Sequence, residues 1–337
     1  MGRTDAVRGR RSIHDVAAEA GVSVATVSRV LSGARSVRED SAAAVLAAVE
    51  KLGYRPNQVG RALRRQQTQV VGMVVPRVNN PFFPSIVQAC EEDLRARGYA
   101  LLLSTSDDDP DVERQRLEML VDRQVDGLLV SPCRWADSGP AVAAAQRLVP
   151  LVELDRGTDG FGGDFVAVDD DGGIGQVVDH LRASGRARLA FVGSDEDNFS
   201  GKARHEAFVR RAGRLPRGHV LLGTFSEAWG YEAGLRVLRG APRPDAVVCA
   251  NDLIAIGVLR AAEELGLSVP GDVAVSGYDD IDMARVCKPS LTTVRQPVAE
   301  LTRTAIDLLL ARMADRGRPA TRRLLGTALV VRESTAG

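Results

Sequence analysis

The stretch AGVSVATVSRVLSG, residues 20–33, is an apolar helix pattern that is interrupted once, at Gly21. Upstream, Ser12 and Asp15 form a capping pair in front of apolar residues at helical spacing, which predicts a first helix. Ser23 is placed to cap a second helix, and Gly21 supplies the turn between them. Two helices joined by so short a turn must cross steeply, so the sequence predicts a helix-turn-helix. The apolar positions are Ile13, Val16, Ala17 and Ala20 in the first helix and Val24, Val27, Val30 and Leu31 in the second.

A third helix pattern follows. Ser36 and Glu39 form an S-x-x-E pair, which is typical of a helix start. The apolar stripe expected to cover the first two helices consists of Ala42, Val45, Leu46, Val49 and Leu52. This pattern favours DNA binding, although small helical triads also serve as protein-binding or purely structural units.

Charge is segregated along the chain. The formal net charge is zero, but residues 1–69 hold 11 Arg and one Lys against three Asp and three Glu, a balance of +6 that leaves −6 for the remainder. Phosphate contacts need Lys and Arg concentrated on one surface, so this asymmetry predicts a polyanionic partner at one end. A solvated basic arm, the alternative, accounts only for Arg3 to Arg11.

Several functional classes are not supported by the sequence. No apolar run approaches the roughly 20 residues of a membrane helix, and the first residues carry no secretory pattern, so we expect a cytoplasmic protein without membrane contact. The cysteines and histidines have no metal-ligand or nucleophile spacing, which predicts no metal site, no cofactor and no catalysis. These residues are Cys90, Cys133, Cys249, Cys287, His14, His180, His205 and His219.

The segments SIHDVAAEAGVSVATVSRVLSG (12–33) and YRPNQVGRAL (54–63) resemble the DNA-binding head of the LacI/GalR family of bacterial transcription regulators. The resemblance implies that the helix over 23–31 enters the major groove of double-stranded operator DNA. Val24 and Ala25 would then offer apolar contacts to base edges, and Arg29 can hydrogen-bond guanine. Thr26 and Ser28 would hold phosphates, unless they are simply solvated.

Residues 56–69 are interpreted as a hinge helix or linker. In the family this segment becomes a helix on DNA, and paired hinges open the minor groove by wedging in a leucine, here Leu63 by position. Asn57 is also expected to contact DNA. Gly60 lowers the helix propensity by roughly 1 kcal/mol, so the hinge should fold only on DNA. The alternative is an interdomain linker.

From residue 70 onward, apolar strand-like runs alternate with amphipathic helix patterns, which predicts parallel sheets with helices on both faces. The length of this region favours two similar lobes with a cleft between them. The runs are VVGMVV (70–75), YALLLST (99–105), VDGLLVS (125–131), PLVELD (150–155), FVAVD (165–169), RLAFVG (188–193), VLLGTF (220–225), AVVCAND (246–252) and VAVSGYD (273–279).

The body also resembles the family's periplasmic-binding-protein type of sensor domain, on the motifs NNPFF, VDGLLV, ANDLIAIGVLRAAEELGLSVPGDVAVSGYDD and LTTVRQP. The resemblance implies a first lobe of residues 70–167 plus a return near 291–311, with the C-terminal strands in the second lobe. By position its effector-binding residues are Asn80, Phe82, Phe83, Asp155, Arg204, Phe225, Asn251, Asp252 and Asp279. Phe82, Phe83 and Asp252 fit structural support equally well. These residue types favour a neutral sugar over a purine or nucleoside.

The expected organisation is therefore a flexible basic arm over 1–11, an all-α helix-turn-helix domain over 12–55, the hinge over 56–69, and a two-lobed α/β effector-binding and dimerisation domain over 70–337. The family resemblance implies a homodimeric regulator, most simply a repressor of carbohydrate-utilisation genes that leaves a palindromic operator when effector binds. Some relatives use a corepressor, which leaves the sign open. VVRESTAG at the end lacks a leucine heptad, which favours a dimer over a coiled-coil tetramer. A solute-binding protein and a sugar-modifying enzyme are the rival interpretations.

Overall fold

The computed structural model describes residues 11–31, 37–54 and 67–336. The chain divides into two compact units, Met1–Thr68 and Gln69–Gly337, and each is described by itself. Within the second unit, two sheets form two lobes.

The first unit contains three helices around a small apolar core. They are α1 (Ile13–Glu19), α2 (Val24–Leu31) and α3 (Glu39–Leu52). The predicted capping box is present at α1, where the Ser12 side chain accepts from the Asp15 amide and the Asp15 side chain accepts from the Ser12 amide. Gly21 has φ of 63°, which glycine adopts without a steric penalty, and so allows the tight turn. Val16, Val27 and Val45 are fully buried between the helices.

Two predictions about this unit are wrong. Leu46 is 57% exposed and does not belong to the covering stripe, because α3 turns Val45 and Ala48 inward instead. The N-cap of α3 is Arg38, so Glu39 is the first residue of the helix and not the third, as the S-x-x-E pair predicted. Ser36 lies outside the described residues, as do the hinge residues Asn57, Gly60 and Leu63.

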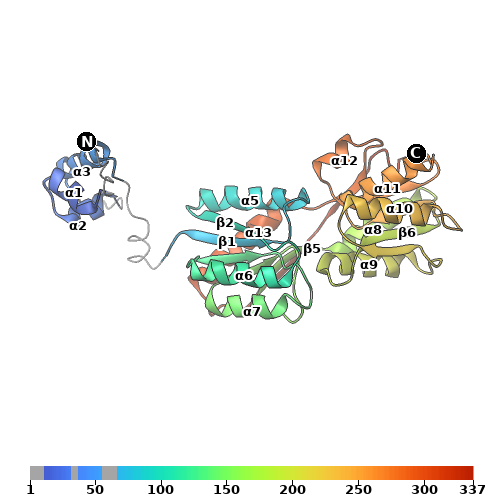
Figure 1. The fold of residues 1–337 in the computed structure, drawn as a ribbon, viewed down its shortest axis with the longest axis horizontal. Helices are drawn as coiled ribbons and strands as arrows, with labels where there is room; N and C mark the ends of the chain where they lie inside the picture. The colour runs from blue at the N-terminus through green and yellow to red at the C-terminus, as the bar shows by residue number, and fades with distance from the viewer. Residues whose placement is uncertain (1–10, 32–36, 55–66, 337) are drawn as a thin grey trace, which may run out of the picture. The chain divides into compact units, whose positions relative to one another are not determined.

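The first lobe is built on a parallel six-stranded sheet of order β11-β5-β4-β3-β1-β2. Helices α5 and α13 cover one face of this sheet, and α6 and α7 cover the other (Figure 1). The strands are β1 (Val70–Val75), β2 (Ala100–Thr105), β3 (Gly127–Val130), β4 (Leu151–Leu154), β5 (Asp164–Val168) and β11 (Arg322–Leu325); the helices are α5 (Phe82–Ala96), α6 (Pro110–Asp122), α7 (Gly139–Leu148) and α13 (Val298–Ala314).

The second lobe has a six-stranded sheet of order β12-β10-β9-β8-β6-β7, parallel except for β12. Helices α8 and α9 pack together, as do α10 and α11, and the sheet lies between the two pairs. The strands are β6 (Leu189–Ser194), β7 (Val220–Gly223), β8 (Ala246–Cys249), β9 (Ala274–Asp279), β10 (Thr292–Arg295) and β12 (Ala328–Val330); the helices are α8 (Asp170–Ala183), α9 (Phe199–Ala212), α10 (Glu227–Leu238), α11 (Asp252–Glu264) and α12 (Asp282–Val286).

The predicted lobe boundaries need correction. The chain crosses between sheets three times, after β5, after β10 and after β11. Strand β10 pairs with β9, so Thr292–Arg295 belongs to the second lobe, and the return to the first lobe begins only with α13. Strand β11 pairs with β5 in the first sheet, so the C-terminal strands are divided between the lobes.

The central strands of each sheet are buried almost along their whole length because helices cover both faces, whereas the edge strands β2, β7, β11 and β12 are partly exposed. The cysteines are unpaired; Cys90, Cys133 and Cys249 are buried. Across the described ranges, no helix is both long and apolar enough to cross a bilayer.

Candidate functional site

The carboxyl ends of strands from both sheets line a cavity of about 360 Å³ between the lobes, which we call the main chamber. Ligands of parallel α/β sheets bind at this edge of the strands. A narrow inner recess shares Asn80, Arg156 and Phe225 with the chamber. The remaining recess residues are Phe82, Asp155, Ser200, Arg204, Asn251, Asp279 and Gln296.

Eight of the nine expected effector residues line the chamber or the recess. Asp252 does not. Its carboxylate accepts from the Ile281 amide at 2.8 Å and from Thr293 Oγ1 at 2.5 Å, which ties the start of α11 to β10 and to the segment after β9. The structure thus gives Asp252 the supporting position that the sequence left open.

Arg204 lies at the centre of a buried charge network and is only 3% exposed. Its Nε donates to Asp170 at 2.7 Å, its Nη1 donates to the Ala250 carbonyl at 2.8 Å, and Asp279 lies 3.5 Å away. Its guanidinium also stacks 3.7 Å from the centre of the Tyr278 ring. Burial opposes the charge on Arg204, but the two carboxylates outweigh it and raise the pKa of this side chain. Within the described ranges Nη2 has no hydrogen-bond acceptor, so Arg204 offers a ligand the N–H groups of this one nitrogen.

Two recess carboxylates are held in unusual states. Burial raises the pKa of Asp155 to about 7 and that of Asp279 to about 6, against the opposing effect of nearby arginines. Asp155 has φ of 69° and Asp279 has φ of 109°, a region that non-glycine residues rarely adopt and that often marks binding sites. Gln296 donates to Asp279 at 2.8 Å. Gln296 thus fixes the Asp279 carboxylate, and burial brings the pKa of both carboxyl groups close to neutral pH.

Arg156 is the most informative residue that sequence reasoning missed. It is 6% exposed, lies 3.8 Å from Asp155, and stands over the rings of Phe83 and Phe225 at 5.1 and 5.6 Å. Within the described ranges its Nε and Nη1 have no hydrogen-bond acceptor, and burial lowers its pKa. The available signal was its position directly after Asp155, at the end of a strand that reaches the cleft.

Other buried polar atoms of the recess share this lack of partners within the described chain. They are Asn251 Nδ2, Gln296 Oε1 and Ser200 Oγ. Buried polar groups in native proteins are almost always hydrogen-bonded. Donors and acceptors thus converge on the inner recess, which has a volume of only about 10 Å³ and adjoins the larger main chamber, where a ligand with hydroxyl or amide groups has room to bind.

In the first unit, α2 presents Ala25 and Arg29 on its exposed side, one helical turn apart. Val24 is partly buried and packs against the core of the three helices. Thr26 turns toward the start of the helix, where its amide donates to Ser23 Oγ at 3.1 Å and its hydroxyl lies 2.9 Å from the same atom. Ser28 is partly buried. Of the five expected DNA-contacting residues on α2, Ala25 and Arg29 are therefore the most accessible.

A helix-turn-helix unit in one chain with a two-lobed α/β body and a polar interlobe cavity defines a ligand-binding regulatory protein that reads DNA. Residues 12–57 match the model for bacterial regulatory proteins of the lacI family, and residues 178–335 match a periplasmic binding protein-like domain. The chain belongs to the lacI family and is a DNA-binding transcriptional repressor.

Similar proteins cover nearly the whole chain. The HTH-type transcriptional repressor PurR of Haemophilus influenzae (strain PittEE) is 34% identical over 309 residues, 90% of this chain and 91% of that protein. PurR of Mannheimia succiniciproducens is 32% identical over 327 residues, 96% and 98% of the two chains. Among solved structures, the lac repressor dimer bound to operator and the anti-inducer ONPF gives a TM-score of 0.88 at 28% identity, covering 97% and 99%. The regulator CelR in complex with cellobiose gives 0.72 at 32% identity, covering 96% and 100%.

Proposed function

We propose that this repressor acts as a cytoplasmic homodimer that reads a palindromic operator and is released when a neutral, sugar-like effector closes the two lobes. The observation that carries the proposal is the enclosed set of polar atoms around Arg156, Asp155 and Asn251. In this proposal the repressor controls carbohydrate-utilisation genes. It acts by binding and not by catalysis.

The chemistry of the recess favours a polyhydroxylated ligand. Sugar hydroxyls both donate and accept, so they suit carboxylate acceptors at Asp155 and Asp279 and a donor at Asn251. Phe225 provides an apolar face for the C–H side of a sugar ring. CelR, which is similar to this chain, is known in complex with cellobiose, and lacI-family regulators of Enterococcus with bound ribose have related folds.

A purine or nucleoside is the alternative effector. The Arg156 guanidinium stands over the rings of Phe83 and Phe225, which could instead stack on a planar base. Because similar repressors carry the name PurR, the test of the effector includes purines and nucleosides.

The proposed DNA contacts lie on α2 and in the hinge. Ala25 and Arg29 would read base edges, assisted by Val24, while Thr26 and Ser28 would contact phosphates. Asn57 and Leu63 would act in the hinge, and a dimer would place two heads on two half-sites, as the similar lac repressor dimer is bound to its operator.

Calorimetric titration of the full chain with a panel of sugars, purines and nucleosides tests the effector class. We expect one sugar to bind and to weaken operator binding, and Arg156→Met to lower its affinity about tenfold or more. Arg116→Met, which removes an exposed arginine of α6, is the matched control and should bind normally. Binding of a purine but no sugar would overturn the sugar assignment, and turnover of a bound sugar would overturn the regulatory mechanism.

A further inference from the structure

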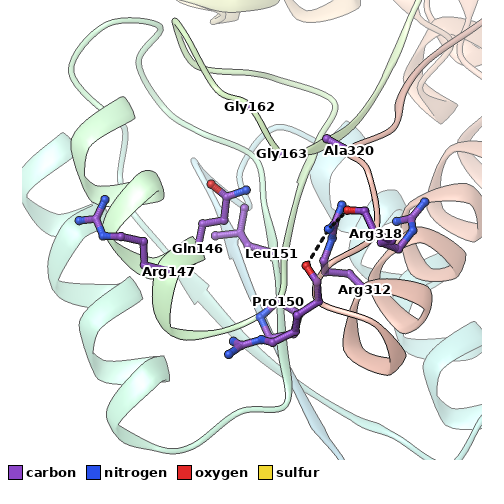
Figure 2. A pocket seen from close by; sticks show the side chains of 10 residues that line it. Gln146, Arg147, Pro150, Leu151, Gly162, Gly163, Arg312, Arg318 and Ala320 are labelled. Carbon is purple, nitrogen blue, oxygen red and sulfur yellow. Dashed lines mark hydrogen bonds between the residues drawn. The ribbon is translucent and has the colours of Figure 1, made fainter.

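A second cavity of about 380 Å³ lies in the first lobe, at the opposite edge of the same sheet (Figure 2). Leu151, which lines it, begins β4, whereas Asp155 follows the end of that strand in the inner recess. None of its lining residues belongs to the main chamber or the recess. It is a separate pocket, which we call the arginine pocket.

Four arginines from two chain segments line this pocket, and they carry more positive charge than the surrounding acids balance. Arg147 comes from the last turn of α7, while the others come from the end of α13 and the turn that follows. These others are Arg312, Arg316 and Arg318. Asp164 is fully buried and forms ion pairs with Arg312 at 2.9 Å and with Arg318 at 3.1 Å. Asp164 therefore balances two of the four guanidinium groups, and among the described residues Arg147 and Arg316 form no ion pair.

Two of the arginines build the pocket. Arg312 donates from Nε to Asp164 and from its two Nη atoms to the carbonyls of Arg316, Arg318 and Pro319, which fixes the turn after α13. Arg318 donates to Asp164 and, at 3.0 Å, to Thr321 Oγ1. Their nitrogens are largely occupied within the protein.

The other two arginines are available to a ligand. Arg147 and Arg316 are exposed, and neither lies within 4.0 Å of a carboxylate anywhere in the described part of the chain. Arg316 makes one hydrogen bond, from Nη2 to the Leu148 carbonyl at 2.6 Å. Asp315, in the same turn, uses Oδ1 to accept from the Gly317 amide and forms no ion pair with Arg147 or Arg316 among the described residues.

Gln146, Arg312 and Arg318 approach the pocket from two sides, while the Arg147 side chain extends outward at its rim (Figure 2). Figure 2 shows Gln146 and Arg147 on one side and Arg312 and Arg318 on the other, with Pro150 and Leu151 between them. A side chain at position 163 would meet Gln146 Nε2 at 2.3 Å, so Gly163 leaves room for the Gln146 amide. Helix-end arginines often satisfy only the last carbonyls. Arg312 has that role. Among the described residues, Arg316 donates to one carbonyl, and no such contact accounts for Arg147.

We propose that the arginine pocket binds the phosphoryl group of a small soluble metabolite, independently of the interlobe effector. Guanidinium groups match phosphate oxygens in bidentate geometry, and they remain charged at any physiological pH. The volume suits a small molecule. Arg147 and Arg316 contact the phosphoryl oxygens, and Gln146 contributes an amide donor.

Calorimetric titration of the full chain with inorganic pyrophosphate, in a buffer free of phosphate and sulfate, tests this site. We expect saturable one-to-one binding that Arg147→Ser/Arg316→Ser weakens about tenfold or more. Arg116→Ser/Arg123→Ser removes two exposed arginines of the same lobe, one in α6 and one directly after it, and should bind as the parent does. The single variant Arg147→Ser, which disturbs no hydrogen bond described above, should be weakened as well, and this result separates loss of a ligand contact from altered folding.

Three results would overturn the proposal. They are no saturable binding of pyrophosphate by the parent, an equal loss in the Arg116→Ser/Arg123→Ser control, and a loss of operator affinity in Arg147→Ser/Arg316→Ser without any pyrophosphate binding. The last result would assign these arginines to the DNA backbone. Sugar binding in the main chamber is measured separately, so failure here leaves the proposed effector site untouched.

Discussion

At the scale of single residues, the two buried arginines of the effector site have opposite energetic roles. Arg204 neutralises Asp170 and Asp279 in a network that is almost closed, whereas among the described residues Arg156 has one distant ion pair and no acceptor for two of its nitrogens. Breaking a buried pair leaves an uncompensated charge, which costs about 3–5 kcal/mol. We therefore expect Arg204→Met to lower the free energy of unfolding by about 3 kcal/mol, while Arg156→Met leaves it unchanged or raises it. Urea unfolding of both variants without effector checks this, and equal losses would contradict the distinction.

Asp155 should link effector binding to pH. Burial raises the pKa of Asp155 to about 7, and the ionised carboxylate accepts hydroxyl hydrogen bonds more strongly than the protonated group, which uses one oxygen as a donor. Effector affinity should consequently fall as the pH is lowered from 8 to 6. Calorimetry across that range measures the dependence, and Asp155→Asn should bind weakly with a much flatter pH profile.

The same carboxyl group should affect stability in the opposite direction. The pKa of Asp155 is raised in the folded state. Between the ordinary pKa of an aspartate and pH 7, the folded protein therefore keeps a proton that the unfolded chain has lost. Its stabilising contribution is present at low pH and disappears as the pH rises through 7. At pH 8 we expect Asp155→Asn to unfold at a higher urea concentration than the parent, because its free energy of unfolding is higher by roughly 1–2 kcal/mol. A lower midpoint would mean that Asp155 is stabilised as a carboxylate.

At the scale of structural elements, the loop after β3 contacts the segment before α9 and the first residue of that helix across the cleft. We call this set of contacts the clasp. Arg134 lies 3.2 Å from Asp195 and 3.9 Å from Asp197, the Trp135 amide donates to the Asp197 carbonyl at 2.7 Å, and the Trp135 ring stacks on Phe199 at 5.3 Å. These contacts hold the two lobes together beside the main chamber. They belong to the arrangement described here, so they stabilise a state in which the recess is enclosed.

Loosening this clasp should weaken effector binding without touching the recess. Arg134 is partly exposed and therefore screened, so we expect Arg134→Ala to raise the effector dissociation constant only about twofold to fivefold, and less at high salt. Trp135→Ala should have a larger effect because it removes the stacking of two partly buried rings. Calorimetry at two salt concentrations distinguishes the two variants, and tighter binding by either would show that the clasp opposes the bound state.

The elements also show where sequence reasoning succeeds. The nine predicted apolar runs coincide with the strands β1 to β9, although β5 begins one residue before its run and β6 ends one residue after it. Strand β11, with the sequence RRLL, has exposed side chains and no such pattern, and the sequence prediction placed it wrongly in the second lobe. The effector residues were located by motif, but the closed network of Arg204 and the open nitrogens of Arg156 depend on contacts between distant segments.

At the scale of the whole molecule, the proposed hinge leucine should separate specific from nonspecific DNA binding. Leu63 lies outside the described residues, and the prediction rests on the family resemblance of the segment around it. A minor-groove wedge contributes only where the DNA is deformed, whereas nonspecific binding depends on phosphate contacts. Leu63→Ala should weaken operator binding far more than binding to random duplex. Anisotropy titrations of both duplexes check this, and equal losses would remove the wedge role.

The regulatory mechanism itself predicts a thermodynamic identity. If effector binding shifts the protein toward a state with lower operator affinity, operator binding must lower effector affinity by the same factor, because both describe one coupling free energy. We expect a factor of about 5–150, the range typical of allosteric coupling. Operator affinity is measured with and without saturating effector, and effector affinity is measured with and without operator duplex. If each ligand lowers the affinity for the other by the same factor, the effector is an inducer. If each raises the affinity for the other by the same factor, the effector is a corepressor. Unequal factors would mean that another ligand binds in only one of the two titrations, and adding pyrophosphate to both would show whether the arginine pocket is responsible.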